Sequence, residues 1–232
     1  SKDITMLVPF YSIEKACESV SEVFRQGITP SALEFIERDA IDWTLKYSDL
    51  EMKISDGVKA HLLIEVDGNN MDLLFNDCEA ISEVMERYEC GEILLADNER
   101  QKKQLWKLRR SISEAVKSNS IYKEEDTVVP RAELPNLLKG VKKIGAKFGF
   151  QSVCYGHAGD GNLHINILRE NILNYSKIKK GRHRKGFSLR HKVASALDAP
   201  ARPCILCEHL CAQFTSARTT PRIKNLGCRV TR

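Results

Sequence analysis

Apolar positions along the chain follow two periods, one typical of strands and one typical of helices. Residues 61–66 (HLLIEV) form a continuous apolar run that ends at Asp67-Gly68, which predicts a buried strand. Residues 13–26 carry apolar side chains at the 3.6-residue period, and Gly27 gives the stop signal of a helix. The same reasoning predicts strands at 4–9, 31–37, 92–96 and 126–129, and helices at 39–47, 98–118, 132–148 and in a segment that ends near Gly91.

The order of these elements predicts a mixed α/β protein with about six or seven short strands and five helices. None of the predicted strands is followed by the G-x-G-x-x-G turn that binds dinucleotides. A Rossmann domain is therefore not predicted.

The stretch at 155–168 (YGHAGDGNLHINIL) combines a glycine-rich bend with a strand. Glycine and asparagine accept the positive φ values of tight turns, and Asp160 and Asn162 are expected to act as turn formers. After the bend, Ile165 and Ile167 alternate with His164 and Asn166, as in a half-buried strand.

This bend can bring His157 close to His164, so that two imidazoles and the carboxamide of Asn166 converge on one polar spot. The alternative is a glycine-rich hairpin with two incidental histidines, because two histidines alone are a poor metal signal. Tyr155 either borders the spot or packs in the core. His61, at a strand start, is expected to be structural.

The segment GHAGDGNLH at 156–164 is very similar to the signature of the C-terminal domain of FAD-linked oxidases. This family includes glycolate oxidase flavin subunits, D-lactate dehydrogenases and D-2-hydroxyglutarate dehydrogenases. The resemblance covers residues from about 4 to 170 and can be extended to Lys180. It implies an α+β fold, in which a ferredoxin-like antiparallel sheet carries helices on one face.

The resemblance also implies roles for the residues of the bend. His157 and His164 would bind a divalent metal next to the flavin, and Asn166 would contact substrate. The FAD cofactor would lie against the backbone of Gly159, Gly161 and Asn162. Neutral imidazoles suit zinc, with manganese or iron possible.

The predicted helix at 98–118 places Arg109 and Ser113 on one apolar face. An arginine there either extends to water or finds an anion. Lys123, beside three acidic residues, reads as a solvated lysine from composition alone. The family resemblance instead implies that Arg109, Ser113 and Lys123 bind the carboxylate of a small 2-hydroxy acid.

Composition is ordinary for a soluble globular protein, with 42% hydrophobic and 29% charged residues. No apolar run is long enough for a membrane span and no signal peptide is evident, so a cytoplasmic protein with reduced cysteines is expected. The net charge of +5 is the sum of two regions with opposite charge balances. Residues 182–232 hold eleven Lys and Arg against two acidic residues, whereas residues 1–181 have a balance of −4. The expected organisation is a domain at 1–181 and an irregular basic tail at 182–232.

Three hypotheses compete for the tail. Cys204, Cys207, His209 and Cys211 include one C-x2-C pair of a zinc site. The basic residues could form an arm that binds nucleic acid. The favoured hypothesis is non-native sequence, such as a frame-shifted gene end, because both the pattern and the charge change abruptly.

The family resemblance therefore implies the substrate- and metal-binding part of an FAD-dependent 2-hydroxy acid dehydrogenase. Such an enzyme transfers hydride from a D-2-hydroxy acid such as lactate or glycolate to FAD, giving a 2-oxo acid. Two features of the family are not recognised in this sequence: the flavin-binding domain, which is an expected partner, and the glycine-flanked Glu-His segment. Glu208-His209 resembles that segment only superficially. A catalytically inactive fragment is the alternative, and a nucleic-acid-binding module is the less favoured one. An electron-transfer partner is also possible.

Overall fold

The computed structural model describes residues 2–96, 98–120, 122–148 and 150–168. The basic tail, its possible zinc ligands and Glu208-His209 lie outside these residues, as does the end of the family resemblance. The described residues form seven strands and five α-helices, in line with the sequence prediction.

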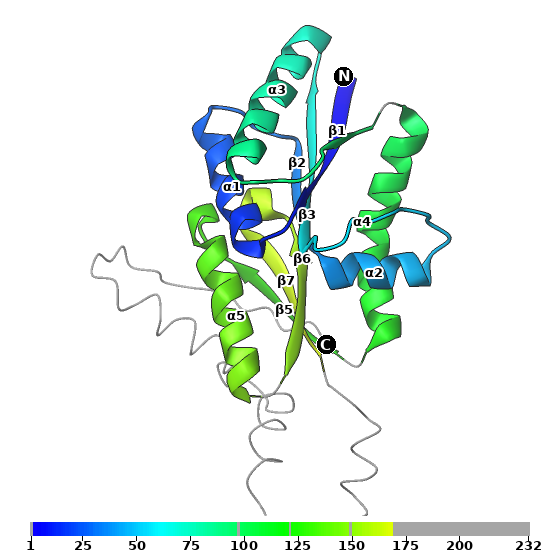
Figure 1. Ribbon diagram of the computed structural model, residues 1–232, viewed down its shortest axis with the longest axis vertical. Helices are drawn as coiled ribbons and strands as arrows, with labels where there is room; N and C mark the ends of the chain where they lie inside the picture. The colour runs from blue at the N-terminus through cyan, green and yellow to red at the C-terminus, as the bar shows by residue number, and fades with distance from the viewer. Residues whose placement is uncertain (1, 97, 121, 149, 169–232) are drawn as a thin grey trace, which may run out of the picture.

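One antiparallel sheet holds all seven strands in the order β4-β1-β3-β2-β6-β7-β5 (Figure 1). The strands are β1 (Lys2–Phe10), β2 (Ala32–Glu37), β3 (Ala60–Gly68), β4 (Leu94–Leu95), β5 (Tyr122–Val128), β6 (Gln151–Gly156) and β7 (Asn162–Leu168). The predicted ferredoxin-like α+β class with an antiparallel sheet is confirmed.

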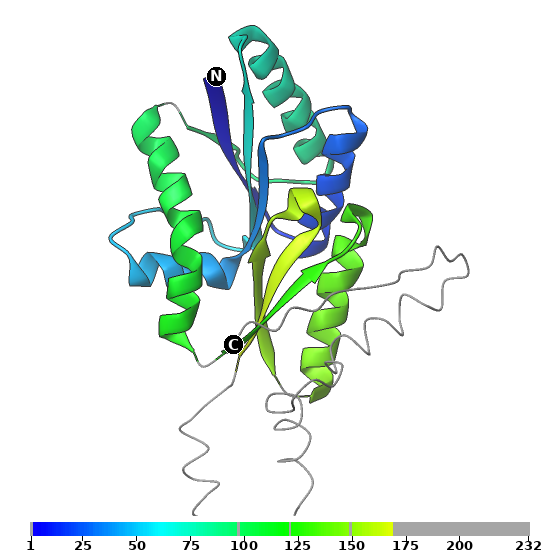
Figure 2. The ribbon, with the colours of Figure 1, turned by 180° about the vertical axis from the view of Figure 1, so that it is seen from behind.

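The helices cover both faces of the sheet (Figures 1 and 2). One face carries α1 (Ile13–Arg25), α3 (Met71–Arg87) and α5 (Leu134–Phe148), and the other carries α2 (Arg38–Tyr47) and α4 (Glu99–Asn119). The prediction of helices on one face describes the first group only. The α2/α4 pair is added because the central strands are apolar on both sides: Leu62 and Ile64 pack under the first group, and Leu63 packs under α2 and α4.

Capping side chains mark the first turns of two helices at the positions that the sequence predicted. The side chains of Ser12 and Asn98 accept hydrogen bonds from backbone N–H groups in the first turns of α1 and α4. Strand β5 begins earlier than the predicted 126–129, because it pairs along its whole length with β7. Its polar sequence YKEEDTV does not by itself indicate a strand.

The sheet is narrow at its centre. Strands β2 and β6 are paired through only two residue pairs, Phe35–Gly156 and Ile36–Tyr155. The pairing stops where β2 gives way to α2. The next β6 amide, that of Cys154, instead donates to the side-chain carboxylate of Glu37 at 2.6 Å.

Candidate functional site

The glycine bend connects β6 to β7 through a single 3-10 turn at Ala158–Asp160. Gly161 has φ +72°, and a Cβ atom there would lie 1.9 Å from the carbonyl oxygen of Val129. Gly156 has φ +151°, and a Cβ atom there would lie 2.8 Å from the carbonyl oxygen of Asn162. Only glycine fits these positions, so the bend has one tightly defined path.

The bend brings the two predicted histidines together. The ring centroids of His157 and His164 are 6.1 Å apart, with the ring planes at 70°. Two imidazoles that share one ion at a metal–nitrogen distance of about 2.1 Å have centroids about 6.5 Å apart when the nitrogens lie on opposite sides of the ion, and about 5.3 Å apart at the tetrahedral angle of zinc. The two rings therefore lie somewhat further apart than a tetrahedral ion requires. The Nδ1 of His164 has no hydrogen-bond partner, and the nearest carboxylates, those of Glu124 and Asp126, lie 3.6 Å away.

Glu34, on β2, connects His157 to Arg109 of α4. One carboxylate oxygen lies 2.6 Å from Nδ1 of His157, and the other accepts a hydrogen bond from Nε of Arg109 at 2.8 Å. The Glu34 and Arg109 side chains are only 6% and 12% exposed. The anion that Arg109 finds in this structure is thus internal, and it lies beside the histidines.

Sequence reasoning missed Glu34, although a signal was present. Glu34 stands between the apolar residues Leu33 and Phe35 in a predicted strand, and a glutamate buried in a strand needs a partner of opposite charge or a hydrogen-bond donor. The partners themselves are 75 and 123 residues away in the chain, so no local pattern names them.

Tyr155 lies between the arginine and the second histidine. Its ring is 5.4 Å from the guanidinium carbon of Arg109 and 5.4 Å from the His164 ring. Burial, reinforced by the Glu124 carboxylate, raises the pKa of Tyr155. Contacts with the Ser113 hydroxyl and the Asn166 amide, together with the Arg109 cation, oppose this shift. Ser113 therefore lies on the same side as Arg109, as the helical spacing predicted.

Asn166 is fully buried on the same face of β7 as His164. Its amide lies close enough to the Tyr155 hydroxyl to lower the pKa of that group, but neither amide atom makes a hydrogen bond of good geometry. A buried carboxamide with its bonds incompletely made is costly, so this amide has capacity for a further partner.

The remaining predicted residues are less informative. Lys123 lies in β5, opposite Ile167. A Cβ atom on Gly159 would lie 3.3 Å from Cβ of Leu33, and the buried Oδ1 of Asn162 has no partner. The tight fit at Gly159 and Gly161 is thus set by the protein's own atoms. His61 is buried below α2, and burial lowers its pKa to about 4.

Within the described residues, no three His, Cys, Asp or Glu side chains are arranged to hold one ion. His157 and His164 supply the right donor atoms for two positions. An ion between them would need its other ligands from substrate, solvent or residues outside the described ranges.

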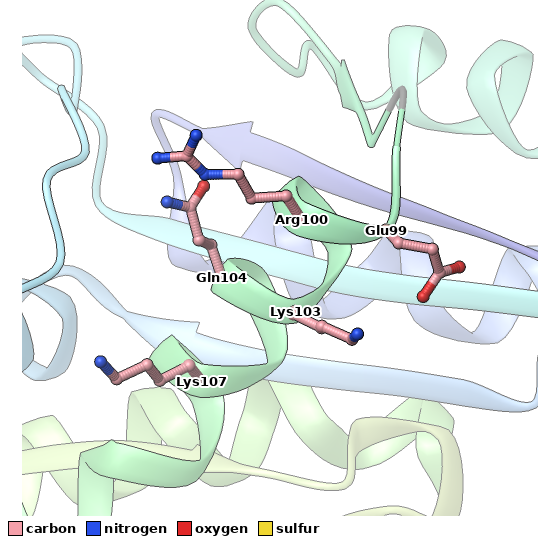
Figure 3. Close-up of a pocket in the computed structure, with 5 residues that line it drawn as sticks. All are labelled: Glu99, Arg100, Lys103, Gln104 and Lys107. Carbon is pink, nitrogen blue, oxygen red and sulfur yellow. The ribbon is translucent and has the colours of Figure 1, made fainter.

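A surface hollow on α4 lies apart from these residues. It is lined by Glu99, Arg100, Lys103, Gln104 and Lys107, which extend outward from the first turns of the helix (Figure 3). It contains none of the predicted site residues. None of the helices in the described ranges is both long and apolar enough to cross a membrane.

Residues 1–179 match the model of the family described as FAD linked oxidases, C-terminal domain. The chain is 32% identical over 167 residues to a D-lactate dehydrogenase of Anaerostipes hadrus, covering 70% of this chain and 35% of that protein. It is 32% identical over 163 residues to the glycolate oxidase subunit GlcD of Bacillus subtilis, covering 69% and 34%. The chain thus spans about a third of the length of these relatives.

Among solved structures, p-cresol methylhydroxylase with substrate bound superposes with a TM-score of 0.51 at 11% identity, covering 77% of this chain and 41% of that one. At this identity the likeness concerns the fold alone.

Proposed function

Because the chain belongs to the family of FAD-linked oxidase C-terminal domains, we propose that it is the substrate-binding part of an FAD-dependent 2-hydroxy acid dehydrogenase. The observation that carries the proposal is the convergence of Arg109, the two histidines and the buried amide of Asn166 on one face of the sheet. A cation can bind the carboxylate of a 2-hydroxy acid, and a metal held by imidazoles can bind its hydroxyl oxygen.

Arg109 would bind the substrate carboxylate. Its Nε donates to Glu34, which leaves the two terminal NH2 groups of the guanidinium to face an acid. Ser113, near the Tyr155 hydroxyl, adds a donor on the same helix face. Lys123 remains part of this proposal through the family resemblance. Asn166 would bond the substrate oxygens with an amide that makes no hydrogen bond of good geometry within the described residues.

His157 and His164 would hold a divalent ion, with zinc preferred for imidazole donors. When bound, such an ion polarises the substrate hydroxyl and eases loss of its proton. Gly159, Gly161 and Asn162 would contact FAD, which when bound accepts the hydride from the carbinol carbon. The reaction then releases one proton and a 2-oxo acid. We assign no proton acceptor among the described residues.

Ligand binding and turnover need separate tests, because the chain spans about a third of its relatives. Binding is followed by calorimetry of the chain with D-lactate or glycolate, with and without Zn²⁺. We expect saturable binding that requires Arg109 and is strengthened by the metal. Binding that is equally strong in Arg109→Met would contradict the proposal.

Turnover is followed by adding FAD and D-lactate and recording loss of the oxidised flavin absorbance. Flavin reduction would show a working enzyme. Binding without reduction would favour the alternative, a domain that keeps the substrate site and is inactive by itself.

A further inference from the structure

Glu34 makes two contacts that impose different demands on its carboxylate. Arg109 always donates, because a guanidinium has no acceptor atom. His157 can either donate or accept at Nδ1, depending on which ring nitrogen carries the proton. A carboxylate only accepts, so with Glu34 ionised both neighbours must donate to it.

We propose that Glu34 is the positioning residue of the site: it fixes the proton of His157 on Nδ1 and holds Arg109 by Nε. The first contact leaves the lone pair of Nε2 free on the side away from β2. The second leaves the terminal NH2 groups of the guanidinium free. This inference rests on the proposed function for its purpose, since Nε2 is the atom that an ion would take and the NH2 groups are those that an acid would take.

The backbone explains why Glu34 reaches both groups. Strands β2 and β6 pair at Phe35–Gly156, and continuing this antiparallel register by one residue sets Glu34 opposite His157. Helix α4 lies over the same face and presents Arg109. The Glu34 side chain is 6% exposed, so solvent offers little competition for its oxygens.

The pattern matches a recurrent design of metal sites. A histidine that binds a metal through one nitrogen usually donates its other N–H to a carboxylate or carbonyl, which fixes the tautomer and the ring orientation. Loss of such a partner typically weakens metal binding by about 10- to 100-fold.

Glu34→Gln gives a sharp test because it keeps shape and burial but removes one acceptor. The amide oxygen should turn to Arg109, since a bond to a charged donor is about twice as strong as a neutral one. The amide NH2 then faces Nδ1 of His157, which must accept, so the ring proton moves to Nε2.

The tautomer is read from ¹⁵N shifts of the imidazole ring in metal-free protein at about pH 8.5, where an ordinary histidine is neutral. We expect Nδ1–H for His157 in the unchanged protein and Nε2–H in Glu34→Gln. The double variant Glu34→Gln/Arg109→Met should return to Nδ1–H, because its amide oxygen is free to face the imidazole. A merely structural role for Glu34 would not produce this reversal.

Glu37→Gln is the matched control. Glu37 lies in the same strand and is equally buried, but it contacts Lys142 and Cys154 instead of His157. It should leave the His157 tautomer unchanged. An Nε2–H tautomer in the unchanged protein, an Nδ1–H tautomer in Glu34→Gln, or no return in the double variant would overturn the proposal.

Zn²⁺ titration separates this inference from the proposed function. We expect Glu34→Gln to weaken Zn²⁺ binding by about 10- to 100-fold. If the unchanged protein binds no Zn²⁺ while the tautomers behave as stated, the metal role fails and the positioning role of Glu34 stands.

Discussion

Two glutamates three residues apart on β2 serve opposite faces of the sheet. Glu37 lies under α5, where its carboxylate contacts Lys142 at 2.7 Å and the Cys154 amide at 2.6 Å. Glu34 lies under α4, where it contacts Arg109 at 2.8 Å and His157 at 2.6 Å. Both are almost fully buried and both have one cationic partner.

The difference lies in what surrounds each pair. The Glu37 pair adjoins the buried thiols of Cys17 and Cys154, and burial raises the pKa of both thiols, so each stays neutral. The Glu34 pair adjoins a histidine pair, and on the same face the buried amide of Asn166 makes no hydrogen bond of good geometry. A buried ion pair alone therefore does not indicate a site; unsatisfied polar groups beside it do.

The largest difference between the two faces is expected at their positive-φ glycines. Gly161→Ala combines a disfavoured φ with a Cβ atom placed on a carbonyl oxygen, and should cost about 4 kcal/mol or more of the free energy of unfolding. Gly27, after α1, also has positive φ but open space around it, so Gly27→Ala should cost about 1 kcal/mol. Urea denaturation measures both. Equal losses would show that the bend can relax.

Arg109→Met and Lys142→Met compare the two cations. Removal of Arg109 should reduce binding of a 2-hydroxy acid at least about 30-fold, the equivalent of about 2 kcal/mol for a charged hydrogen bond. Removal of Lys142 should destabilise the fold by about 2 kcal/mol and leave acid binding unchanged. Calorimetry with D-lactate and urea denaturation test both variants. Comparable loss of D-lactate binding in both variants would contradict the proposal that only the α2/α4 face binds the acid.

His61 gives the α2/α4 face a sensitivity to acid. Burial lowers its folded pKa to about 4, below the ordinary value near 6.5, so the unfolded chain takes up the proton first. The stability contributed by the neutral form is present above pH 6.5 and is lost as the pH falls towards 4. We expect the unchanged protein to lose about 3 kcal/mol more than His61→Gln over this interval. Parallel stability curves for the two proteins would contradict this account.

Glu37 should give the opposite face a smaller, opposite response. Burial raises its pKa and the Lys142 cation partly offsets this, so the folded state holds the proton more firmly than the unfolded state. Its contribution to stability is therefore present at low pH and decreases as the pH rises through the raised pKa. Glu37→Gln should remove this component, which thermal unfolding measured from acid to neutral pH would reveal. An unchanged profile would rule it out.

The sequence predicted those parts of the site that have local causes. The glycines, which accept positive φ, allowed the bend to be predicted, and the predicted bend placed His157 near His164. Helical spacing placed Arg109 and Ser113 on one face. The partner of Arg109 was missed because Glu34 is 75 residues away, and the extent of β5 was missed because its pairing with β7 determines it. The second helical layer was missed although the unbroken apolar run in β3 indicates burial on both sides.

The junction between β2 and β6 divides the sheet into a four-stranded half and a three-stranded half, joined by two backbone pairs. Glu34 belongs to the first half and both histidines belong to the second. The chemistry proposed for this molecule thus exists only while the two halves stay in register, and a slip of a single residue at this seam would separate the carboxylate from its imidazole without unfolding either half.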